Sequence, residues 1–389
     1  IVLEAGHRLG GHADTQKVMD GGVERFVDTG FIVFNERHFP LLTDWFKAMG
    51  VSWEDSDMSF AVSDLNSGLE YNATSFNRLF CQRKNLISPR FWGMFADIVR
   101  FYRQAPTLLE HLDDSVTLGE WLNQSELGHM FAQQHLLPMA SALWSAPMGK
   151  VADFPMRHLL QFMDNHNMLQ LAGRPTWRTV SGGSRTYVEN AARCDATFCT
   201  STAAKAVQRL DGGVRIQTAT GEIEADAVIF ACHSDQALRL LTDPSENERR
   251  VLGAIEYQPN EVVLHTDTSL LPSLPQARAA WNVRRDGRHA DSCRVSYYMN
   301  LLQNIEGPTD YIVSLNQTDQ IDPDRVLVRR RYHHPVFTPA AIRAQQSWSA
   351  VNGQRRTWFC GAWWGWGFHE DGARSARRVV DHLEHWHHG

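Results

Sequence analysis

Hydrophobic and polar positions in the first half of the chain alternate between strand-like and helical spacing. A short β-type run ends in Glu4, and two further β-type runs lie within residues 19–34, around a Gly-Gly pair and an Asp-Thr-Gly motif. Within 40–49 the apolar residues share one helical face, and Gly50 follows as a C-terminal stop. Residues 53–72 predict strands joined by a turn, and residues 75–144 predict aromatic-rich helices.

The second half of the chain also contains both predicted strands and predicted helices. Residues 180–193 predict a strand, a Gly-Gly turn and a helix, and two strands flank Gly212-Gly213 as a hairpin. A buried strand leading into a helix is expected over 221–241, and β-type alternation returns over 255–335. Residues 356–386 predict a strand, a glycine-rich aromatic turn and a last helix. The chain is therefore expected to have an α/β fold.

The order of these elements indicates two interleaved domains, which also suits a length of 389 residues. We expect residues 1–34, 175–240 and 345–389 to form one discontinuous, Rossmann-like nucleotide-binding domain. The intervening residues, 35–174 and 241–344, would form a second domain of mixed α+β structure.

Composition narrows the functional class. The formal net charge is −6, which argues against nucleic acid as a partner. No apolar run approaches the roughly 18 residues of a membrane-spanning helix. The six cysteines form no CxxC pair and are too sparse for a disulfide framework, so we expect reduced thiols in a cytoplasmic protein.

In dinucleotide-binding folds the second strand ends in an acidic residue, and the first short strand of this chain ends in Glu4. The carboxylate of such a residue accepts hydrogen bonds from a ribose diol, about 20 residues after a glycine fingerprint. Only three residues precede Glu4, so the fingerprint is missing, and the chain is expected to be an N-terminally truncated fragment.

Four motifs, in order, resemble those of the flavin-containing amine oxidase and phytoene desaturase superfamily. They are Glu-x3-Arg-Leu-Gly-Gly from Glu4, the Asp-Thr-Gly segment, the Val-Ser-Gly-Gly-Ser turn, and the final segment from Phe359 to Ala376. The resemblance implies an FAD-binding domain, a substrate domain and an active site between them. It implies FAD contacts from Glu4, Arg8, Gly10, Gly11, Thr29, Gly30, Ala204, Gly361, Asp371, Gly372 and Ala373.

Three shorter segments (GFHEDG, FNERHFP and DMSF) are similar to bacterial proteins described as NAD/FAD-binding and amine-oxidase-like. Two features depart from the superfamily pattern. Trp363 and Trp364 stand where amine oxidases commonly carry an acidic residue, which puts amine oxidation itself in doubt. The missing fingerprint leaves an inactive FAD-like scaffold as an alternative.

The resemblance places His369, Trp364 and His12 as catalytic candidates. Trp363, Trp364, Trp366, Phe368 and His369 would form an aromatic wall facing the flavin, or would simply be core packing. His12 would stabilise negative charge on reduced flavin, or make a structural hydrogen bond. The implied reaction is hydride transfer from a C–N or C–C bond to FAD, with a lipid or isoprenoid desaturase or isomerase as the alternative.

Two clusters have competing interpretations. His382 and His385 share a helical face, but no acid or cysteine completes a metal site, so no metal is expected. Aromatic and basic residues alternate over 90–103, which is typical of a packed helix face, or of a membrane-surface helix that delivers a lipid. We therefore expect a cytoplasmic protein that acts on a small molecule or a lipid. Peripheral association with a membrane is compatible with either interpretation of residues 90–103.

Overall fold

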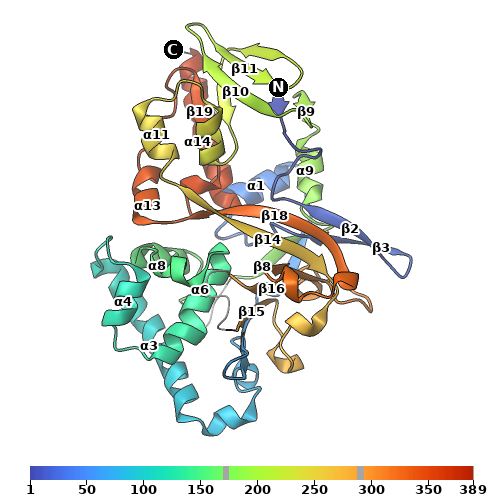
Figure 1. The fold of residues 1–389 in the computed structure, drawn as a ribbon, viewed down its shortest axis with the longest axis vertical. Helices are drawn as coiled ribbons and strands as arrows, with labels where there is room; N and C mark the ends of the chain where they lie inside the picture. Colours follow the sequence, from blue (N-terminus) through green and yellow to red (C-terminus); the bar gives the residue numbers. More distant parts are fainter. Residues whose placement is uncertain (170–174, 287–292, 389) are drawn as a thin grey trace.

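The upper half of the molecule in Figure 1 is assembled from segments that lie far apart in the sequence. The computed structural model describes residues 1–169, 175–286 and 293–388. Two parallel strand pairs carry this half, β1 with β9 and β13 with β19, beside a three-stranded antiparallel sheet in the order β10-β11-β12. Its strands are β1 (Val2–Leu3), β9 (Phe198–Cys199), β10 (Ala204–Arg209), β11 (Val214–Thr218), β12 (Glu222–Ala225), β13 (Val228–Phe230) and β19 (Thr357–Phe359).

Helices and one apolar cluster hold these strands together. Leu3, Val207, Phe359 and Trp363 belong to the same cluster, so the start, middle and end of the chain share one core. The helices of this half are α9 (Arg185–Ala191), α10 (Ser234–Leu240), α11 (Glu246–Leu252), α13 (Pro339–Gln345) and α14 (His369–His388).

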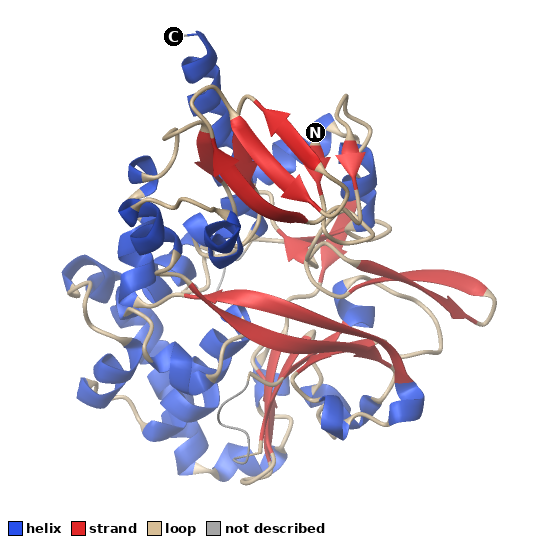
Figure 2. Cartoon of the chain, turned by 45° about the horizontal axis from the view of Figure 1, so that its top comes forward, coloured by secondary structure: helices blue, strands red, loops and turns tan. Residues whose placement is uncertain are grey.

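The lower half is built on a seven-stranded mixed sheet in the order β18-β14-β17-β16-β15-β6-β7. The long strands β14 and β18 pair in antiparallel fashion and cross the middle of the molecule below the upper half (Figures 1 and 2). The strands are β6 (Phe60–Asp64), β7 (Leu69–Asn72), β14 (Glu256–His265), β15 (Trp281–Arg285), β16 (Val295–Tyr298), β17 (Ile312–Leu315) and β18 (Val326–Val336).

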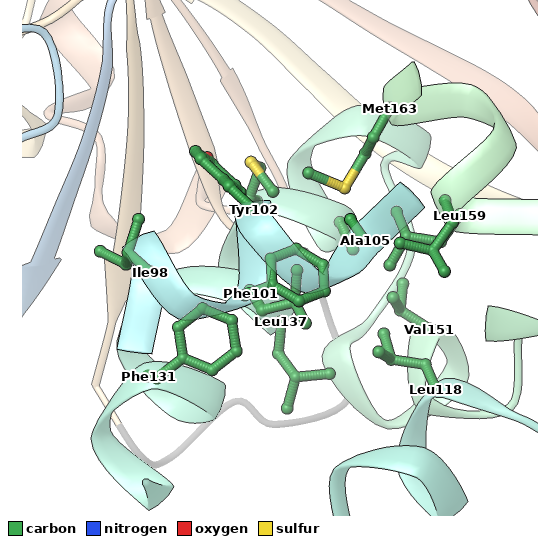
Figure 3. Packing of buried hydrophobic residues seen from close by; sticks show 14 of the residues in the cluster. Ile98, Phe101, Tyr102, Ala105, Leu118, Phe131, Leu137, Val151, Leu159 and Met163 are labelled. Atoms are coloured by element: carbon green, nitrogen blue, oxygen red, sulfur yellow. The ribbon is translucent and has the colours of Figure 1, made fainter. Parts of the chain in front are cut away.

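A layer of helices covers part of this sheet and contains the largest core cluster (Figure 3). One face of α3 supplies Phe91, Met94, Ile98, Phe101 and Tyr102 to that cluster. The packed-face interpretation of residues 90–103 is therefore confirmed for most of the helix. The α-helices are α2 (Phe76–Leu79), α3 (Pro89–His111), α4 (Leu118–Gln124), α5 (His129–Phe131), α6 (Leu137–Trp144), α7 (Met148–Ala152), α8 (Met156–Asn165) and α12 (Met299–Leu302).

Short turns of 3-10 or π-helix connect many of these elements. The 3-10 turns are η1 (Arg83–Ile87), η3 (Thr268–Leu270), η4 (Pro275–Ala277), η5 (Thr318–Gln320), η6 (Pro323–Arg325), η7 (Trp348–Ala350) and η8 (Ala362–Trp364). A π-helical turn, η2 (Ala132–Leu136), leads into α6.

A third group of elements lies where the two halves meet. The hairpin of β2 (Thr15–Asp20) and β3 (Val23–Asp28) projects from the side of the molecule in both views (Figures 1 and 2). A small antiparallel sheet has the order β4-β8-β5, with β4 (Val33–Phe34), β5 (Trp53–Ser56) and β8 (Trp177–Val180). Helix α1 (Pro40–Ala48) packs against α14, and Glu370 accepts hydrogen bonds from the Leu41 and Leu42 N–H groups, 3.2 and 3.0 Å long.

Most predicted elements are confirmed, including the helix over 40–49 and the hairpin around Gly212-Gly213. The single buried strand expected within 221–241 was wrong. The chain forms β12 and β13, which pair with different partners, and Ile229 of β13 is 43% exposed. In the described part of the chain, no helix is both long and apolar enough to cross a membrane. The six cysteines are free thiols.

Candidate active site

The Gly10-Gly11 loop after β1 has a backbone that only glycine fits well. Gly10 has φ +107°, and a Cβ atom there would lie 2.6 Å from the Ala13 carbonyl oxygen and 3.1 Å from a Val188 methyl group. Gly11 has φ +55° and faces open space, so the backbone is bare on that side. Such a loop permits the close approach of a phosphate-containing ligand.

Polar side chains fix this loop from within. Arg8 donates to the carbonyl oxygens of Leu9, Gly11 and Ala13 over 2.8–3.1 Å. Glu4 follows β1 directly, and its Oε1 accepts a 2.6 Å hydrogen bond from the Gly6 N–H. Arg8 therefore shapes the loop.

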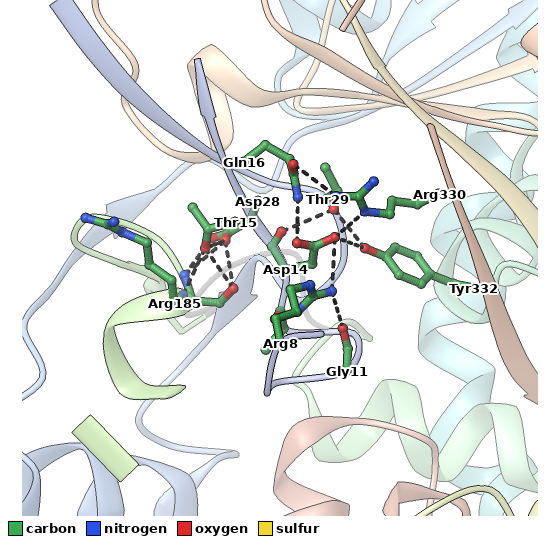
Figure 4. A network of polar contacts seen from close by, with 12 residues as sticks. Arg8, Gly11, Asp14, Thr15, Gln16, Asp28, Thr29, Arg185, Arg330 and Tyr332 are labelled. Atoms are coloured by element: carbon green, nitrogen blue, oxygen red, sulfur yellow. Dashed lines mark hydrogen bonds and ion pairs between the residues drawn. The ribbon is translucent and has the colours of Figure 1, made fainter. Parts of the chain in front are cut away.

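Asp14, which is 1% exposed, connects the glycine loop to the long strand β18 (Figure 4). Its Oδ2 atom accepts from Arg330 Nε at 2.7 Å and from the Tyr332 hydroxyl at 3.0 Å. The same atom forms a 3.1 Å ion pair with Arg8. With these three partners, the buried carboxylate of Asp14 fixes the strand and the loop together.

The Asp-Thr-Gly segment lies directly against the glycine loop. A Cβ atom at Gly30 would overlap the His12 carbonyl oxygen, which accepts a 3.0 Å hydrogen bond from the Phe31 N–H. The Thr29 hydroxyl contacts Tyr332 Oη at 2.8 Å. Glycine at position 30 is therefore required for the two segments to pass each other.

Asp28 is a buried junction between three distant segments. It accepts hydrogen bonds from the Ser184 N–H and hydroxyl at 2.9 and 2.7 Å, from Thr15 Oγ1 at 2.5 Å, and from Gln303 Nε2 at 2.8 Å. Burial raises the pKa of Asp28 from 3.8 to about 6, although these hydrogen bonds oppose the shift.

The first turn of α14 closes the other end of the site. The His369 ring stacks on Phe31 with centroids 3.6 Å apart, and its Nε2 lies 2.9 Å from the Tyr187 hydroxyl. Asp371 accepts from the Trp366 and Phe368 N–H groups at 3.0 and 3.1 Å. The carboxylate of Asp371 therefore shapes the loop that precedes α14, and burial raises its pKa to about 6.

The remaining predicted residues of the final segment lie around this turn. Gly361 precedes η8, and its N–H donates a 2.8 Å hydrogen bond to Ser375 Oγ. Gly372 and Ala373 lie within the first turn of α14. A helix start of this kind favours negative charge on a ligand, because its first N–H groups have no partner within the helix.

A cavity of about 880 Å³ lies between the glycine loop, the small sheet, β18 and the start of α14. His12, Gly30, Phe31, Phe368 and His369 line one end of it. Aromatic and aliphatic side chains form most of the remaining wall, including Phe39, Phe60, Phe76, Leu79, Phe95, Leu143, Trp144, Phe162, Met168, Trp177, Trp281, Phe337 and Trp366.

A second cavity of about 170 Å³ shares part of this wall. Ala142, Leu143 and Trp281 line both cavities. Ile98, Tyr102, His135 and Met139 extend the second one toward α3 and α6. Together the two cavities form an apolar space that continues from the glycine loop into the helical layer.

Buried imidazoles line the cavity near the glycine loop. The His12 and His334 rings are 5.5 Å apart, and His334 Nδ1 lies 2.8 Å from Asn260 Nδ2. Burial lowers the pKa of His12 to about 3 and that of His334 to about 4, and repulsion from neighbouring imidazoles, His233 and His333 among them, adds to both shifts. These rings are therefore neutral at pH 7.

Of the predicted residues, His12, Gly30 and His369 line the cavity, whereas Trp364 and Ala204 lie in other surroundings. Trp364 is not among the described residues that line the cavity, and its Nε1 donates a 2.9 Å hydrogen bond to the Phe359 carbonyl oxygen. Ala204 lies in β10 and packs on the core of the upper half. Of the predicted aromatic residues in this segment, Trp366, Phe368 and His369 line the cavity, whereas Trp363 and Trp364 do not.

Several residues of the site were not singled out from the sequence. Asp14 follows the glycine loop, and Ser184 and Tyr187 lie in and just after the Val-Ser-Gly-Gly-Ser turn. Ser184 could have been predicted, because it is a polar residue next to a glycine turn. Phe162 and Tyr332 carried no such signal. Among the described residues, no group of His, Cys, Asp and Glu is arranged to hold a metal ion.

One buried imidazole near the cavity provides a pH test. Burial lowers the pKa of His158 from 6.5 to about 4, and its Nε2 has no hydrogen-bond partner among the described residues. Neutral His158 makes its full contribution to the free energy of unfolding above pH 6.5. That contribution is lost as the pH falls toward 4. We expect His158→Phe to be about 2 kcal/mol more stable, relative to wild type, at pH 5 than at pH 8.

Urea unfolding of both proteins at the two pH values measures this difference. His111→Phe is the matched control, because this imidazole is largely exposed and should leave the pH dependence unchanged. An equal wild-type-to-variant difference at both pH values would contradict the assignment of a neutral, buried His158.

Fold and site together define a flavin-dependent oxidoreductase. The bare Gly11 backbone, the tight Gly10 and Gly30 contacts and the start of α14 fit FAD, which these segments would hold. The sequence model of the family described as flavin containing amine oxidoreductase matches residues 1–300. The chain belongs to this family, whose cofactor is FAD.

Solved structures give the same fold. A cyclohexylamine oxidase from Brevibacterium oxydans superimposes with TM-score 0.68 at 12% identity, over 98% of this chain and 93% of that one. A CLA-producing fatty acid isomerase from P. acnes has TM-score 0.68 at 14% identity, over 98% and 91%. A putrescine oxidase bound to putrescine has TM-score 0.65 at 13% identity, over 98% and 93%. Comparison with curated proteins gives no match.

Proposed function

We propose that the protein oxidises or rearranges a long, largely apolar substrate, such as a lipid or isoprenoid, at a C–C bond beside the flavin. FAD would supply hydride acceptance, and the chain would supply position and exclusion of water. The observation that carries this proposal is the wall of the cavity. Asp57 is its only charged carboxylate among the described residues, and that group already accepts a 2.6 Å hydrogen bond from the Ser59 N–H.

The wall offers a cationic amine little negative charge, although it is rich in aromatic rings. A cationic ammonium group requires carboxylates or an aromatic cage. Phe162 and Phe368 stack on each other with centroids 5.0 Å apart, so one face of each ring is occupied by packing. Support for amine oxidation comes from the family and from the named oxidase structures, whereas the fatty acid isomerase shows that the same fold accepts an acyl chain. Amine oxidation is the second candidate.

The residues near the flavin have positioning roles in this proposal. His369, held between Phe31 and the Tyr187 hydroxyl, would keep the start of α14 in place against the cofactor. His12 would present a neutral ring to the same end of the cavity. Burial lowers the pKa of both rings to about 3, so each is a neutral imidazole at pH 7 and neither would place a positive charge beside the flavin.

The test is an anaerobic reaction of the FAD-loaded protein, followed by flavin absorbance. We expect bleaching, or conversion of the lipid, with unsaturated fatty acids or acyl lipids, and none with putrescine or cyclohexylamine. Bleaching by the amines alone would favour the second candidate. Protein that binds no flavin after incubation with FAD would indicate the inactive scaffold.

A single substitution tests where the acyl chain lies. Ala142 lines both cavities and is 2% exposed, so Ala142→Leu should narrow the passage between them. We expect KM to rise about tenfold for a long acyl chain and to change little for a short one. Ala340→Leu, at an exposed helical position, is the matched control. Equal effects on both chain lengths would contradict this placement.

A further inference from the structure

The segment of residues 73–92 lies at the end of the molecule opposite the chain termini (Figure 1), and it carries an exposed apolar surface. Four large side chains of α2, η1 and the first turn of α3 form it. Ile87 is 86% exposed, Phe76 56%, Leu86 41% and Trp92 40%. Large apolar side chains gathered in this way on a protein surface usually mark an interaction site.

The packing beneath these side chains makes the surface an ordered platform. Phe80 is buried, and its ring lies 4.6 Å from that of Phe76 and 4.9 Å from that of Trp92, measured between centroids. Trp92 Nε1 donates a 2.9 Å hydrogen bond to the Leu86 carbonyl oxygen. The exposed rings are therefore held in place from below.

The segment that carries this platform has only positively charged side chains. Arg78, Arg83, Lys84 and Arg90 lie within residues 71–96, which contain no Asp or Glu, although the whole chain has a net charge of −6. These four side chains are exposed. Arg83 bonds to Asn77 and to the Phe80 carbonyl, and none of the four pairs with a carboxylate among the described residues. An apolar centre with a basic rim complements an anionic lipid surface.

The substrate cavity reaches the surface at the same place. Residues 73–76 are exposed and also line the large cavity. Leu79 and Phe95 continue the wall inward from them, toward the second cavity. A lipid leaving a bilayer against this platform would meet an apolar path directly.

We infer that residues 73–92 dock the protein on the surface of an anionic phospholipid bilayer, with the cavity mouth facing the membrane. The apolar side chains would enter the headgroup boundary, and the four cations would contact lipid phosphates. The role of the cavity mouth in delivering substrate rests on the function proposed above, whereas docking itself does not.

Vesicle co-sedimentation of the purified full chain tests the docking. We expect binding to vesicles that contain phosphatidylglycerol, little binding to phosphatidylcholine alone, and release at high salt. Each cation near an anionic surface strengthens binding about fivefold. The triple variant Arg83→Gln, Lys84→Gln, Arg90→Gln should therefore bind roughly 100-fold more weakly. Ile87→Ser should also weaken binding, without changing thermal stability, because the side chain is exposed.

Val380→Ser is the matched control, since Val380 is 44% exposed on α14. The inference is overturned if the wild type binds neither vesicle, or if the patch variants bind as well as Val380→Ser. It is also overturned if the platform instead joins two copies of the chain, which ultracentrifugation without lipid would show. Flavin bleaching with detergent-solubilised lipid is measured separately, so failure of docking and failure of the proposed reaction are distinguishable.

Discussion

Gly30→Val is expected to abolish flavin retention and to destabilise the protein by about 3 kcal/mol or more. A Cβ atom at this position overlaps the His12 carbonyl oxygen, which is a backbone atom and cannot rotate away. The Asp-Thr-Gly segment and the glycine loop would therefore separate. That separation would remove the wall that Gly30, Phe31 and His12 form at one end of the cavity.

Flavin content after incubation with FAD and urea unfolding of the variant measure the two effects. Gly149→Ala is the matched control, because a Cβ atom there meets nothing within 4 Å and Gly149 lies in a helix. Alanine in a helix should be neutral or stabilising by roughly 0.5–1 kcal/mol. A Gly30→Val protein with normal flavin content would show that the two segments do not enclose the cofactor.

Asp28→Ala should cost about 3 to 5 kcal/mol of unfolding free energy. The substitution leaves the Ser184 N–H and hydroxyl, the Thr15 hydroxyl and the Gln303 amide without their shared acceptor in a buried site. These donors come from three separate segments, so the loss should loosen the start of α9 and the β2–β3 hairpin together. The matched control is Asp44→Ala, which removes a carboxylate that is 76% exposed on α1.

The pH dependence of Asp28→Asn tests the environment of the same carboxyl group. Its folded pKa of about 6 lies above the ordinary 3.8, so the native state binds the proton more tightly. Protonated Asp28 makes its full contribution to the free energy of unfolding below about pH 4. That contribution is lost as the pH rises through 6. We expect the wild type to gain about 1 kcal/mol over Asp28→Asn between pH 7 and pH 5. A constant difference would contradict the raised pKa.

Much of the site could be predicted because its sequence signals are local. Glycines at positions 10, 11 and 30 mark backbone that passes close to another chain segment or a ligand, and the structure shows the steric reason at Gly10 and Gly30. An acid-Gly-Ala sequence at the start of a helix marks an anion site in the same way. Such motifs depend on neighbours within a few residues.

The choice among the clustered tryptophans could not be predicted. Trp363 and Trp364 lie in the single 3-10 turn η8 and Trp366 in the loop after it, a segment too short for a helical or strand period to be read from the sequence. Periodicity is what assigns a side chain to one face of an element. Trp363 Nε1 bonds to the Cys232 carbonyl oxygen, whereas Trp366 lines the cavity, and no local pattern distinguishes the two.

The sequence by itself therefore determined the family, the order of strands and helices, and the glycine loops that fit FAD. Only the tertiary structure decided that Asp14 and Asp28 each gather partners from distant segments, that Trp366 rather than Trp364 lines the cavity, and that the exposed residue Phe76 lines it too. The physical reason is that backbone conformation depends on adjacent residues, whereas partners of a buried carboxylate and walls of a cavity are set by long-range packing.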